Sequence, residues 1–203
     1  MARHDHEHDH DGDHDHRDNG SHDDEAAGLD AERAARKQFA LSQVRQYGDP
    51  VLRMRANEVD SFDEELVRVT ERMVGLMHDA EGIGLAATQV GILRRFFVFH
   101  DEGEDMVLVN PVITSTGAEL ETSEEGCLSL GPVRMPVERP TEVTIEGLDA
   151  SGAPVHFELE GLPARVVQHE LDHLDGKLVL DRTDPESRRE ALARLRPRLI
   201  LTR

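Results

Sequence analysis

The sequence predicts an α+β fold, because helix-like patterns stand at both ends of the body and strand-like patterns fill its middle. Apolar residues recur at helical spacing between residues 66 and 77 and again between 162 and 173. From residue 95 to residue 160, short apolar runs and alternating apolar and polar residues indicate buried and half-buried strands.

Two helices are predicted in the first half of the chain. Residues 29–46 favour a helix that leads into the body. Farther on, Ser61-Phe62-Asp63-Glu64 has the form of a capping box. An apolar stripe follows it and predicts a core-facing helix of about 16 residues that ends before Gly82. The stripe consists of Leu66, Val69, Met73, Leu76 and Met77.

Four strands are predicted in the middle of the chain. Residues 95–99 and 106–109 are short apolar runs, which indicate buried strands. Residues 143–145 and 155–159 alternate between apolar and polar side chains, and a turn signal at residues 149–152 lies between them. We therefore expect these last two strands to form a hairpin.

The last part of the chain predicts two more helices. Pro163 suits the first turn of a helix. Four residues in this stretch keep the 3.6-residue period: Leu162, Val166, His169 and His173. Residues 185–196 predict a final amphipathic helix that stops near Pro197.

The helical pattern at residues 162–173 carries the residues suited to chemistry. His169 and His173 are four residues apart, so on a helix they share one face and can bind the same metal ion. Glu170 projects beside them and can hold or move a proton of water activated there. Taken alone, the same pattern also arises by chance on a partly exposed helix.

Two further residues are candidates for the same site. Cys127 is the single cysteine of the sequence, so it is a buried small hydrophobe, a nucleophile or a metal ligand. It lies 42 residues before His169, and spacing alone does not place it at a metal. Gln89 closes a glycine-rich stretch, where it makes ordinary hydrogen bonds or donates to a developing oxyanion.

Composition limits the other functions. Residues 1–25 hold ten acidic residues against Arg3 and Arg17, a net of −8, together with seven of the twelve histidines. We expect a disordered tail that binds transition metals weakly or only solubilises the protein. The remaining residues carry −19 − (−8) = −11, and this acidic charge argues against a general nucleic-acid binder. No apolar run suits a membrane span or a signal peptide, so we expect a cytoplasmic protein.

Three stretches together resemble the three motifs of bacterial peptide deformylases. They are the glycine-rich segment from Gly82 to Gln89, the Glu-Gly-Cys-Leu-Ser segment from Glu125 to Ser129, and the Gln-His-Glu-x-x-His segment from Gln168 to His173. Residues 49–53 are similar to the usual opening of the family. The resemblance covers about residues 42–182 and keeps the order of the motifs, but it does not extend to the N-terminal tail.

The resemblance implies a role for each motif residue. The metal ligands would be Cys127, His169 and His173, and Glu170 would be the catalytic acid and base. The amide of Gln89 and the backbone N–H of Leu128 would stabilise the oxyanion. The implied substrate is the formyl-methionine end of a nascent peptide. Its recognition would use Ile83, Gly84, Arg134 and Val166.

The resemblance also bears on the identity of the metal and on how the chain is divided into segments. A Cys-His-His set suits zinc by softness, but the family implies Fe²⁺ in the cell, with Zn²⁺, Ni²⁺ or Co²⁺ able to replace it. We expect a tail at residues 1–25, a helical lead-in at 26–41, a catalytic domain at 42–182 and a basic helix at 183–203. From Arg182 onward the chain carries a net charge of +4, which suits docking to the ribosome or is only a solvated helix face.

Two other functions remain open at this point. The first is a zinc endopeptidase, because His169, Glu170 and His173 followed by Gly176 match part of a protease pattern. That pattern needs a third histidine where this chain has Val179. The second is a non-enzymatic protein that stores or senses metal through its histidine-rich tail.

Overall fold

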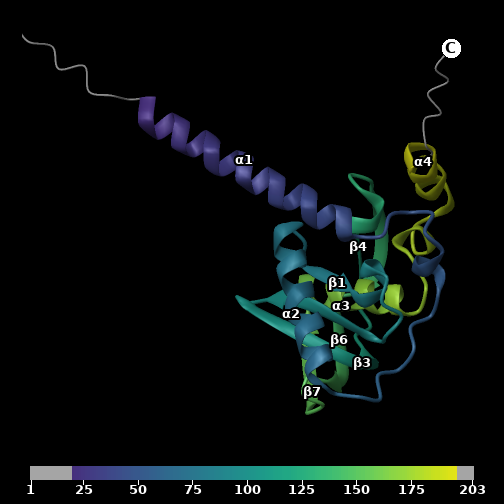
Figure 1. The fold of residues 1–203 in the computed structure, drawn as a ribbon. Coiled ribbons are helices and arrows are strands. Elements are labelled where there is room, and N and C mark those ends of the chain that lie inside the picture. Colours follow the sequence, from purple (N-terminus) through teal and green to yellow (C-terminus); the bar gives the residue numbers. More distant parts are fainter. Residues whose placement is uncertain (1–19, 196–203) are drawn as a thin grey trace, which may run out of the picture.

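The computed structural model describes the backbone of residues 20–195 and the side chains from residue 28 onward (Figure 1). Its helices are α1 (Gly20–Gln43), α2 (Glu64–Asp79), α3 (Leu162–Leu174) and α4 (Pro185–Leu195). Its strands are β1 (Gly84–Ala86), β2 (Phe96–Asp101), β3 (Glu104–Thr116), β4 (Leu120–Gly126), β5 (Arg134–Pro140), β6 (Glu142–Leu148) and β7 (Pro154–Glu160). Short 3₁₀ turns η1 (Pro50–Arg53), η2 (Ala87–Val90), η3 (Leu128–Leu130) and η4 (Val179–Asp181) lie between them.

Within residues 20–195, the strands form two antiparallel sheets. Five strands pair in the order β1-β2-β3-β6-β7, and β4 pairs with β5 in a separate hairpin. Helices packed on antiparallel sheets confirm the α+β class. The expected hairpin between residues 143–145 and 155–159 is the pair β6 and β7.

Strand β2 has a helix on each of its faces, which explains its uninterrupted apolar run. Phe96 and Val98 pack with α2 in one buried cluster, whereas Phe97 and Phe99 pack with α3 in another. All four side chains are fully buried. Because successive side chains of a strand point to opposite faces, a strand between two helices has no polar face.

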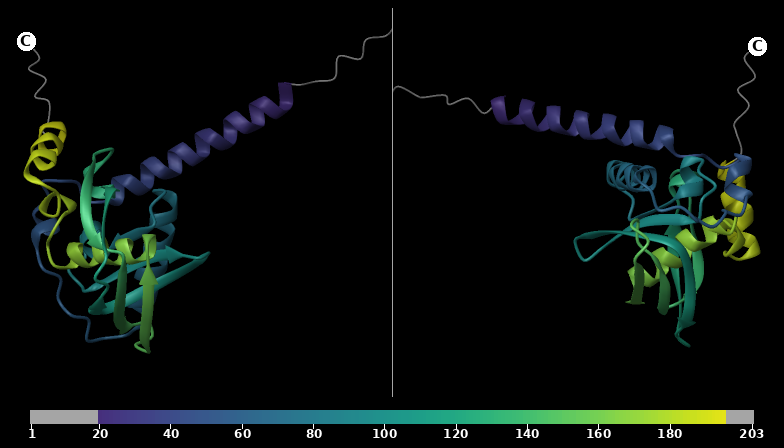
Figure 2. Two further views of the ribbon diagram at one scale, coloured as in Figure 1. Left: turned by 180° about the vertical axis from the view of Figure 1, so that it is seen from behind. Right: turned by 60° about the horizontal axis from the view of Figure 1, so that its bottom comes forward.

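Helix α3 lies against the sheet through one side and faces β4 and β5 with the other. Its apolar residues Ala164, Val167 and Leu174 are fully buried beside β2, β3 and β6. The β5 strand, η4 and α4 form a third buried cluster, which includes Cys127. The two sheets therefore meet around α3 (Figure 2).

Helix α1 extends away from the body in every view and contacts it near its C-terminal end (Figure 2). Ala40 and Val44 are buried against α2 there. The helix begins at Gly20, inside the segment 1–25 expected to be a disordered tail, and residues 1–19 lie outside the described part of the chain. The expected stop near Pro197 also lies outside the described residues.

The expected capping box at the start of α2 is wrong. The N-cap is Asp63, whose carboxylate accepts the N–H of Leu66 at 3.0 Å, and the Ser61 hydroxyl donates to that carboxylate at 3.1 Å. An ionised carboxylate at a helix N-terminus is favoured by the helix dipole, so Asp63 takes the position that Ser61 was expected to hold.

Strand β3 is longer than the apolar run at residues 106–109 predicts. It continues to Thr116 by pairing with β6 through an irregularity between Val109 and Val112, where Asn110 has φ 51°. Bulges admit residues that an alternating pattern does not reveal. In the described part of the chain, no helix combines the length and the apolar character that crossing a bilayer needs.

Candidate active site and metal centre

Helix α3 presents the two histidines of the motif as a pair. Gly161, with φ 65°, turns the chain from β7 into the helix, and Pro163 lies in the first turn. Four residues advance a helix by slightly more than one turn, so His169 and His173 stand on the same face. Their ring centroids are 4.9 Å apart, with the rings at 73° to each other.

Cys127 reaches the same place from the end of the β4 strand. Its Sγ lies 3.2 Å from Nε2 of His173, and the ligand atoms of Cys127, His169 and His173 all lie within 4.8 Å of one another. The structure therefore brings the three expected ligands together, which sequence spacing alone did not do. One thiolate and two imidazoles form a donor set that fits a divalent transition metal and leaves a coordination position free.

The cysteine is held in the form that binds metals. Burial alone would raise the pKa of the Cys127 thiol, but the rings of His173 and His169 lower it well below its usual value. Burial would likewise lower the pKa of His169, whereas Cys127 and Glu125 raise it well above its usual value. The neighbouring rings therefore favour the thiolate of Cys127, which is the species that ligates a metal, whereas His169 would bind a metal as the neutral imidazole.

Glu170 lies beside the ligands with its carboxylate almost removed from solvent. The residue is 4% exposed, and Oε2 has no hydrogen-bond partner among the described residues. Burial raises the pKa of Glu170, against the opposing effect of His169 and His173. Gly84 closes over it: a Cβ at this position would stand 2.5 Å from Glu170 Oε1. A buried carboxylate of raised pKa is suited to both accepting and donating a proton.

Gln89 is oriented by its own backbone turn. The N–H of Ala86 donates to its Oε1 at 2.9 Å, which leaves Nε2 directed at Ser129 Oγ (3.2 Å) and Cys127 Sγ (3.6 Å). The side chain is buried, so its donor is fixed next to the ligand cluster. Leu128, the other expected oxyanion donor, follows Cys127 directly and begins η3.

A cavity of about 670 Å³ opens onto these groups. Nine of the ten residues named from the sequence line it: Ile83, Gly84, Gln89, Cys127, Leu128, Arg134, Val166, His169 and Glu170. The tenth, His173, lies below its floor, where it is 1% exposed. Lys37 and Leu41 of α1 also line this cavity, which the resemblance did not indicate.

A buried ionic network that the sequence did not reveal supports the ligands from behind. Nδ1 of His169 lies 3.0 Å from Oε2 of Glu125, and Arg139 holds both oxygens of that carboxylate at 2.7 and 3.0 Å. Arg139 also donates to Asp172 at 3.0 Å, and Arg165 donates to Glu125 at 2.8 Å. Glu125 and Asp172 stand inside the motifs, so their position was a signal. Nothing local marks the arginines.

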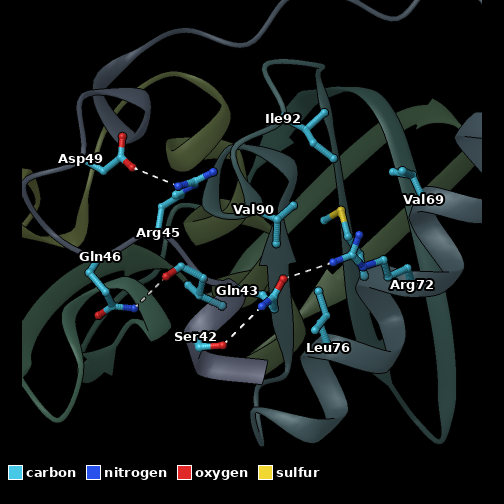
Figure 3. Close-up of a pocket in the computed structure, with 12 residues that line it drawn as sticks. Ser42, Gln43, Arg45, Gln46, Asp49, Val69, Arg72, Leu76, Val90 and Ile92 are labelled. Carbon is cyan, nitrogen blue, oxygen red and sulfur yellow. Dashed lines mark hydrogen bonds and ion pairs between the residues drawn. The ribbon is translucent and has the colours of Figure 1, made fainter. Parts of the chain in front are cut away.

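A second cavity of about 320 Å³ lies between the end of α1 with the loop after it, α2 and the end of η2 (Figure 3). Arg45 and Arg72 line it, with an ion pair from Arg45 to Asp49 at 3.8 Å and a hydrogen bond from Arg72 to Gln43 at 3.3 Å. Its lining includes none of the ten candidate residues, so the chemistry belongs to the larger cavity.

Known proteins are similar to this chain in sequence and in fold. The model of the polypeptide deformylase family matches residues 41–189. A peptide deformylase of Thermotoga neapolitana is 47% identical over 148 residues, which are 73% of this chain and 90% of that protein. Peptide deformylase 1 of Corynebacterium glutamicum is 47% identical over 162 residues, covering 78% and 96% of the two chains.

Solved structures agree with the sequence relatives. The crystal structure of the Thermotoga maritima peptide deformylase has 45% identity and a TM-score of 0.68, covering 70% of this chain and 97% of that one. The Synechococcus elongatus peptide deformylase, solved in complex with actinonin, has 42% identity and a TM-score of 0.72, covering 74% and 84%. With its matched residues folded around a Cys-His-His cluster, this chain belongs to the polypeptide deformylase family.

Proposed function

We propose that Glu170, Gln89 and Leu128 carry out the hydrolysis of the formyl group from formyl-methionine, next to a metal held by Cys127, His169 and His173. As a family member, the chain is a metal-dependent hydrolase that deformylates the N-termini of newly made polypeptides. One observation carries the residue assignment. A buried carboxylate, one oxygen of which has no hydrogen-bond partner among the described residues, and a fixed amide donor both stand at the three-ligand cluster and line one cavity.

The ligand set is compatible with the proposed metal and with its substitutes. Fe²⁺ is the ion that we propose for the cell, with Zn²⁺, Ni²⁺ or Co²⁺ able to replace it, because imidazole and thiolate donors accept all four. A divalent ion held by these residues supplies a Lewis acid that makes water more acidic and polarises a carbonyl group. Cys127 would be the position most sensitive to oxidation, since thiolates oxidise more readily than thiols.

Glu170 would move the proton in both halves of the reaction. Its carboxylate accepts a proton as water adds to the formyl carbon, and then passes that proton to the amine nitrogen as the C–N bond breaks. Formate and a free N-terminal amine are the products. The raised pKa of Glu170, which burial causes, brings the carboxylate closer to the pH at which such transfers work best.

Gln89 and Leu128 would stabilise the negative charge that develops on the formyl oxygen. The Nε2 donor of Gln89 is held in place by the Ala86 contact, so it needs no reorganisation as the charge grows. Leu128, whose backbone N–H would be the second donor, directly follows Cys127 in the chain and lines the same cavity. Two fixed donors in a buried site lower the barrier more than mobile donors in water.

The cavity supports recognition of an extended peptide with an apolar first side chain. Strand β1 is an edge of the five-stranded sheet: Gly84 pairs with Phe99 on one side, and a peptide strand can pair along the other. Ile83 and Val166 line the cavity and would contact the methionine side chain. Arg134, which donates to the carbonyl of Glu124 at 3.0 Å, would orient the peptide farther out.

Formate release tests this function directly. Full-length chain loaded anaerobically with Fe²⁺ should release formate from a short N-formyl-methionyl peptide and leave the matching N-acetyl peptide intact. An internal peptide bond in the same substrate should survive, whereas a zinc endopeptidase would cut it. A metal-loaded chain that releases no formate, or that cuts the internal bond instead, contradicts the proposal.

We also propose that the chain consists of the four segments expected from its sequence and that the last of them, residues 183–203, docks to the ribosome. The protein would then act in the cytoplasm. The arginines from Arg182 onward support this, since ribosomal RNA is a polyanion. Ala191 of α4 is buried, so a deletion would disturb packing. Replacing the exposed Arg189 and Arg194 by glutamine should instead reduce co-sedimentation with ribosomes at low salt. Unchanged co-sedimentation would argue against docking.

A further inference from the structure

The body of the chain holds a second group of metal-ligand side chains, away from the catalytic cavity. Twelve histidines minus the seven in the first 25 residues leave five: His78, His100, His156, His169 and His173. Two of these form the catalytic pair, and two others meet at one carboxylate, Asp105. The second group stands on the opposite face of β2 from α3, because His100 shares the face of Phe96 and Val98.

Strand register brings His100 and Asp105 together. They are directly opposite each other in the β2–β3 hairpin, whose two-residue turn has Glu102 at φ 48° and Gly103 at φ 89°. Such a turn suits the twist of a hairpin and fixes its register. Nδ1 of His100 consequently lies 2.7 Å from Oδ1 of Asp105.

His78 joins the pair from the last turn of α2. Its Nε2 lies 2.7 Å from Oδ1 and 2.9 Å from Oδ2 of Asp105. The two imidazole rings are 5.2 Å apart and nearly perpendicular. One ligand atom from each of the three residues lies within 4.8 Å of the others, the same limit that the catalytic Cys-His-His group meets.

The donor set and its surroundings suit a borderline divalent cation. Two imidazole nitrogens and one carboxylate oxygen are ligands that zinc accepts at about 2.0–2.2 Å, with water completing the shell. The present N···O separations would need to open by about 0.5 Å for tetrahedral binding at such distances. The side chains of His78, His100 and Asp105 are 45, 35 and 34% exposed, so they have room to do so.

The carboxylate is already held ionised. The partial burial of Asp105 would raise its pKa, but the hydrogen bonds from His78 and His100 lower it below its ordinary value. An ionised carboxylate with both neighbouring rings aimed at it presents a concentrated set of lone pairs once the ring protons leave.

We propose that His78, His100 and Asp105 form a second metal site, which binds Zn²⁺ or a similar divalent cation outside the catalytic cleft. A cation there would tie the C-terminal end of α2 to the β2–β3 hairpin. The cation would also lie close to the wall of the catalytic cavity. The backbone N–H of His100 donates to the carbonyl of Ile83 at 3.0 Å, and Ile83 lines that cavity. This site is independent of the catalytic assignment and survives if that assignment fails.

Zinc stoichiometry in the full-length protein tests the proposal. The parent chain, already zinc-loaded at the catalytic site, is dialysed against one fixed free Zn²⁺ concentration beside the variant His78→Gln/His100→Gln. The histidine-rich tail is present in both, so its contribution cancels. We expect the variant to hold one zinc ion fewer per chain. His156→Gln is the matched control, because His156 is also an exposed histidine beside carboxylates, at 3.2 Å from Glu146, and it should lose none.

A second readout locates the ion and guards against misfolding. Zn²⁺ titration of ¹⁵N-labelled parent protein should shift the amide signals of residues 78–84 and 100–105. Asp105→Asn should abolish those shifts, while the zinc-free variant still unfolds in one cooperative thermal transition. Equal zinc content in parent and double variant, or amide shifts that survive Asp105→Asn, would overturn the proposal and leave the group as a hydrogen-bonded triad.

Discussion

The carboxylate of Glu125 holds His169 from behind: Oε2 lies 3.0 Å from Nδ1, so Nε2 of the same ring is left for the metal. Burial alone would raise the pKa of Glu125, but the hydrogen bonds from His169 and Arg139 lower it to about 2. The support is therefore an anion at any pH at which the protein works. Such partners fix the orientation of a ligand ring and strengthen its basicity.

Replacing Glu125 by glutamine should weaken metal binding without unfolding the protein. The amide keeps the shape of the side chain but removes the charge that orients His169, so we expect metal affinity to fall about 10- to 100-fold. Competition with a chelator measures that affinity. Glu124→Gln is the control, because this neighbour is exposed and should bind metal like the parent. Equal affinities in both variants would show that Glu125 does not position the ligand.

Replacing Arg139 by methionine should be among the most destabilising single changes. Arg139 is 4% exposed and bridges two buried carboxylates, those of Glu125 and Asp172. Its loss removes one buried partner from each carboxylate, and breaking a buried ion pair typically costs about 3–5 kcal/mol. Urea unfolding measures the loss. Arg134→Met, on the same strand but exposed, should cost less than about 0.5 kcal/mol, and a similar small cost at Arg139 would contradict the network's role.

Gly84→Ala should lower turnover, whereas Gly75→Ala should raise the stability of the fold. At Gly84 a Cβ would stand 2.5 Å from Glu170 Oε1 and 2.9 Å from Val166 Cγ1, so the methyl group must displace the catalytic carboxylate. We expect kcat to fall by at least tenfold with metal content unchanged. Gly75 lies inside α2 with nothing within 4 Å, so alanine there should stabilise the fold by about 0.5–1 kcal/mol. Normal turnover in Gly84→Ala would contradict the close contact.

The free energy of unfolding should decrease at acid pH as Asp181 becomes protonated. The carboxylate of Asp181 pairs with Arg53 and accepts the N–H of Leu178. Burial alone would raise the pKa of Asp181, but these hydrogen bonds lower it below its ordinary 3.8. The unfolded chain therefore binds the proton more tightly, so the stabilisation is complete above pH 3.8 and is lost as the pH falls through the lowered pKa.

The variant Asp181→Asn makes this dependence measurable. Unfolding of the metal-free chain, with chelator throughout, should cost about 1 kcal/mol less in the variant at pH 7. That difference should shrink steadily as the pH falls below the ordinary pKa of the carboxyl. Asp60→Asn, at an exposed loop position, is the control and should match the parent. A gap that stays constant down to acid pH would rule out the ionised pair as its source.

The sequence predicted those helices and strands that are determined by residues close to one another in the chain. The stripe from Leu66 to Met77 gives α2, and the His169–His173 spacing gives one face of α3, because both depend on the helical period alone. The alternation around the turn at residues 149–152 likewise gives the β6–β7 hairpin. The N-cap of α2 was misplaced, since Ser61 and Asp63 both suit that position by composition.

Tertiary contacts account for what the sequence did not reveal. Cys127 reaches His173 because the β4–β5 hairpin packs against α3, and no spacing rule encodes that contact. The bridge from Arg139 to Glu125 and Asp172 joins three segments of the chain in the same way. The motif resemblance could name the cysteine as a ligand, but only the fold shows what holds the ligands in place.

The most direct test of the catalytic account is the variant Glu170→Gln, compared with the parent at equal metal content. Glutamine fills the same buried space but cannot accept and return a proton. We expect Glu170→Gln to retain its metal and to be at least as stable as the parent, while formate release from an N-formyl-methionyl peptide falls by about 10²–10⁴-fold. Release at the parent rate by metal-loaded Glu170→Gln would contradict the role given to this carboxylate.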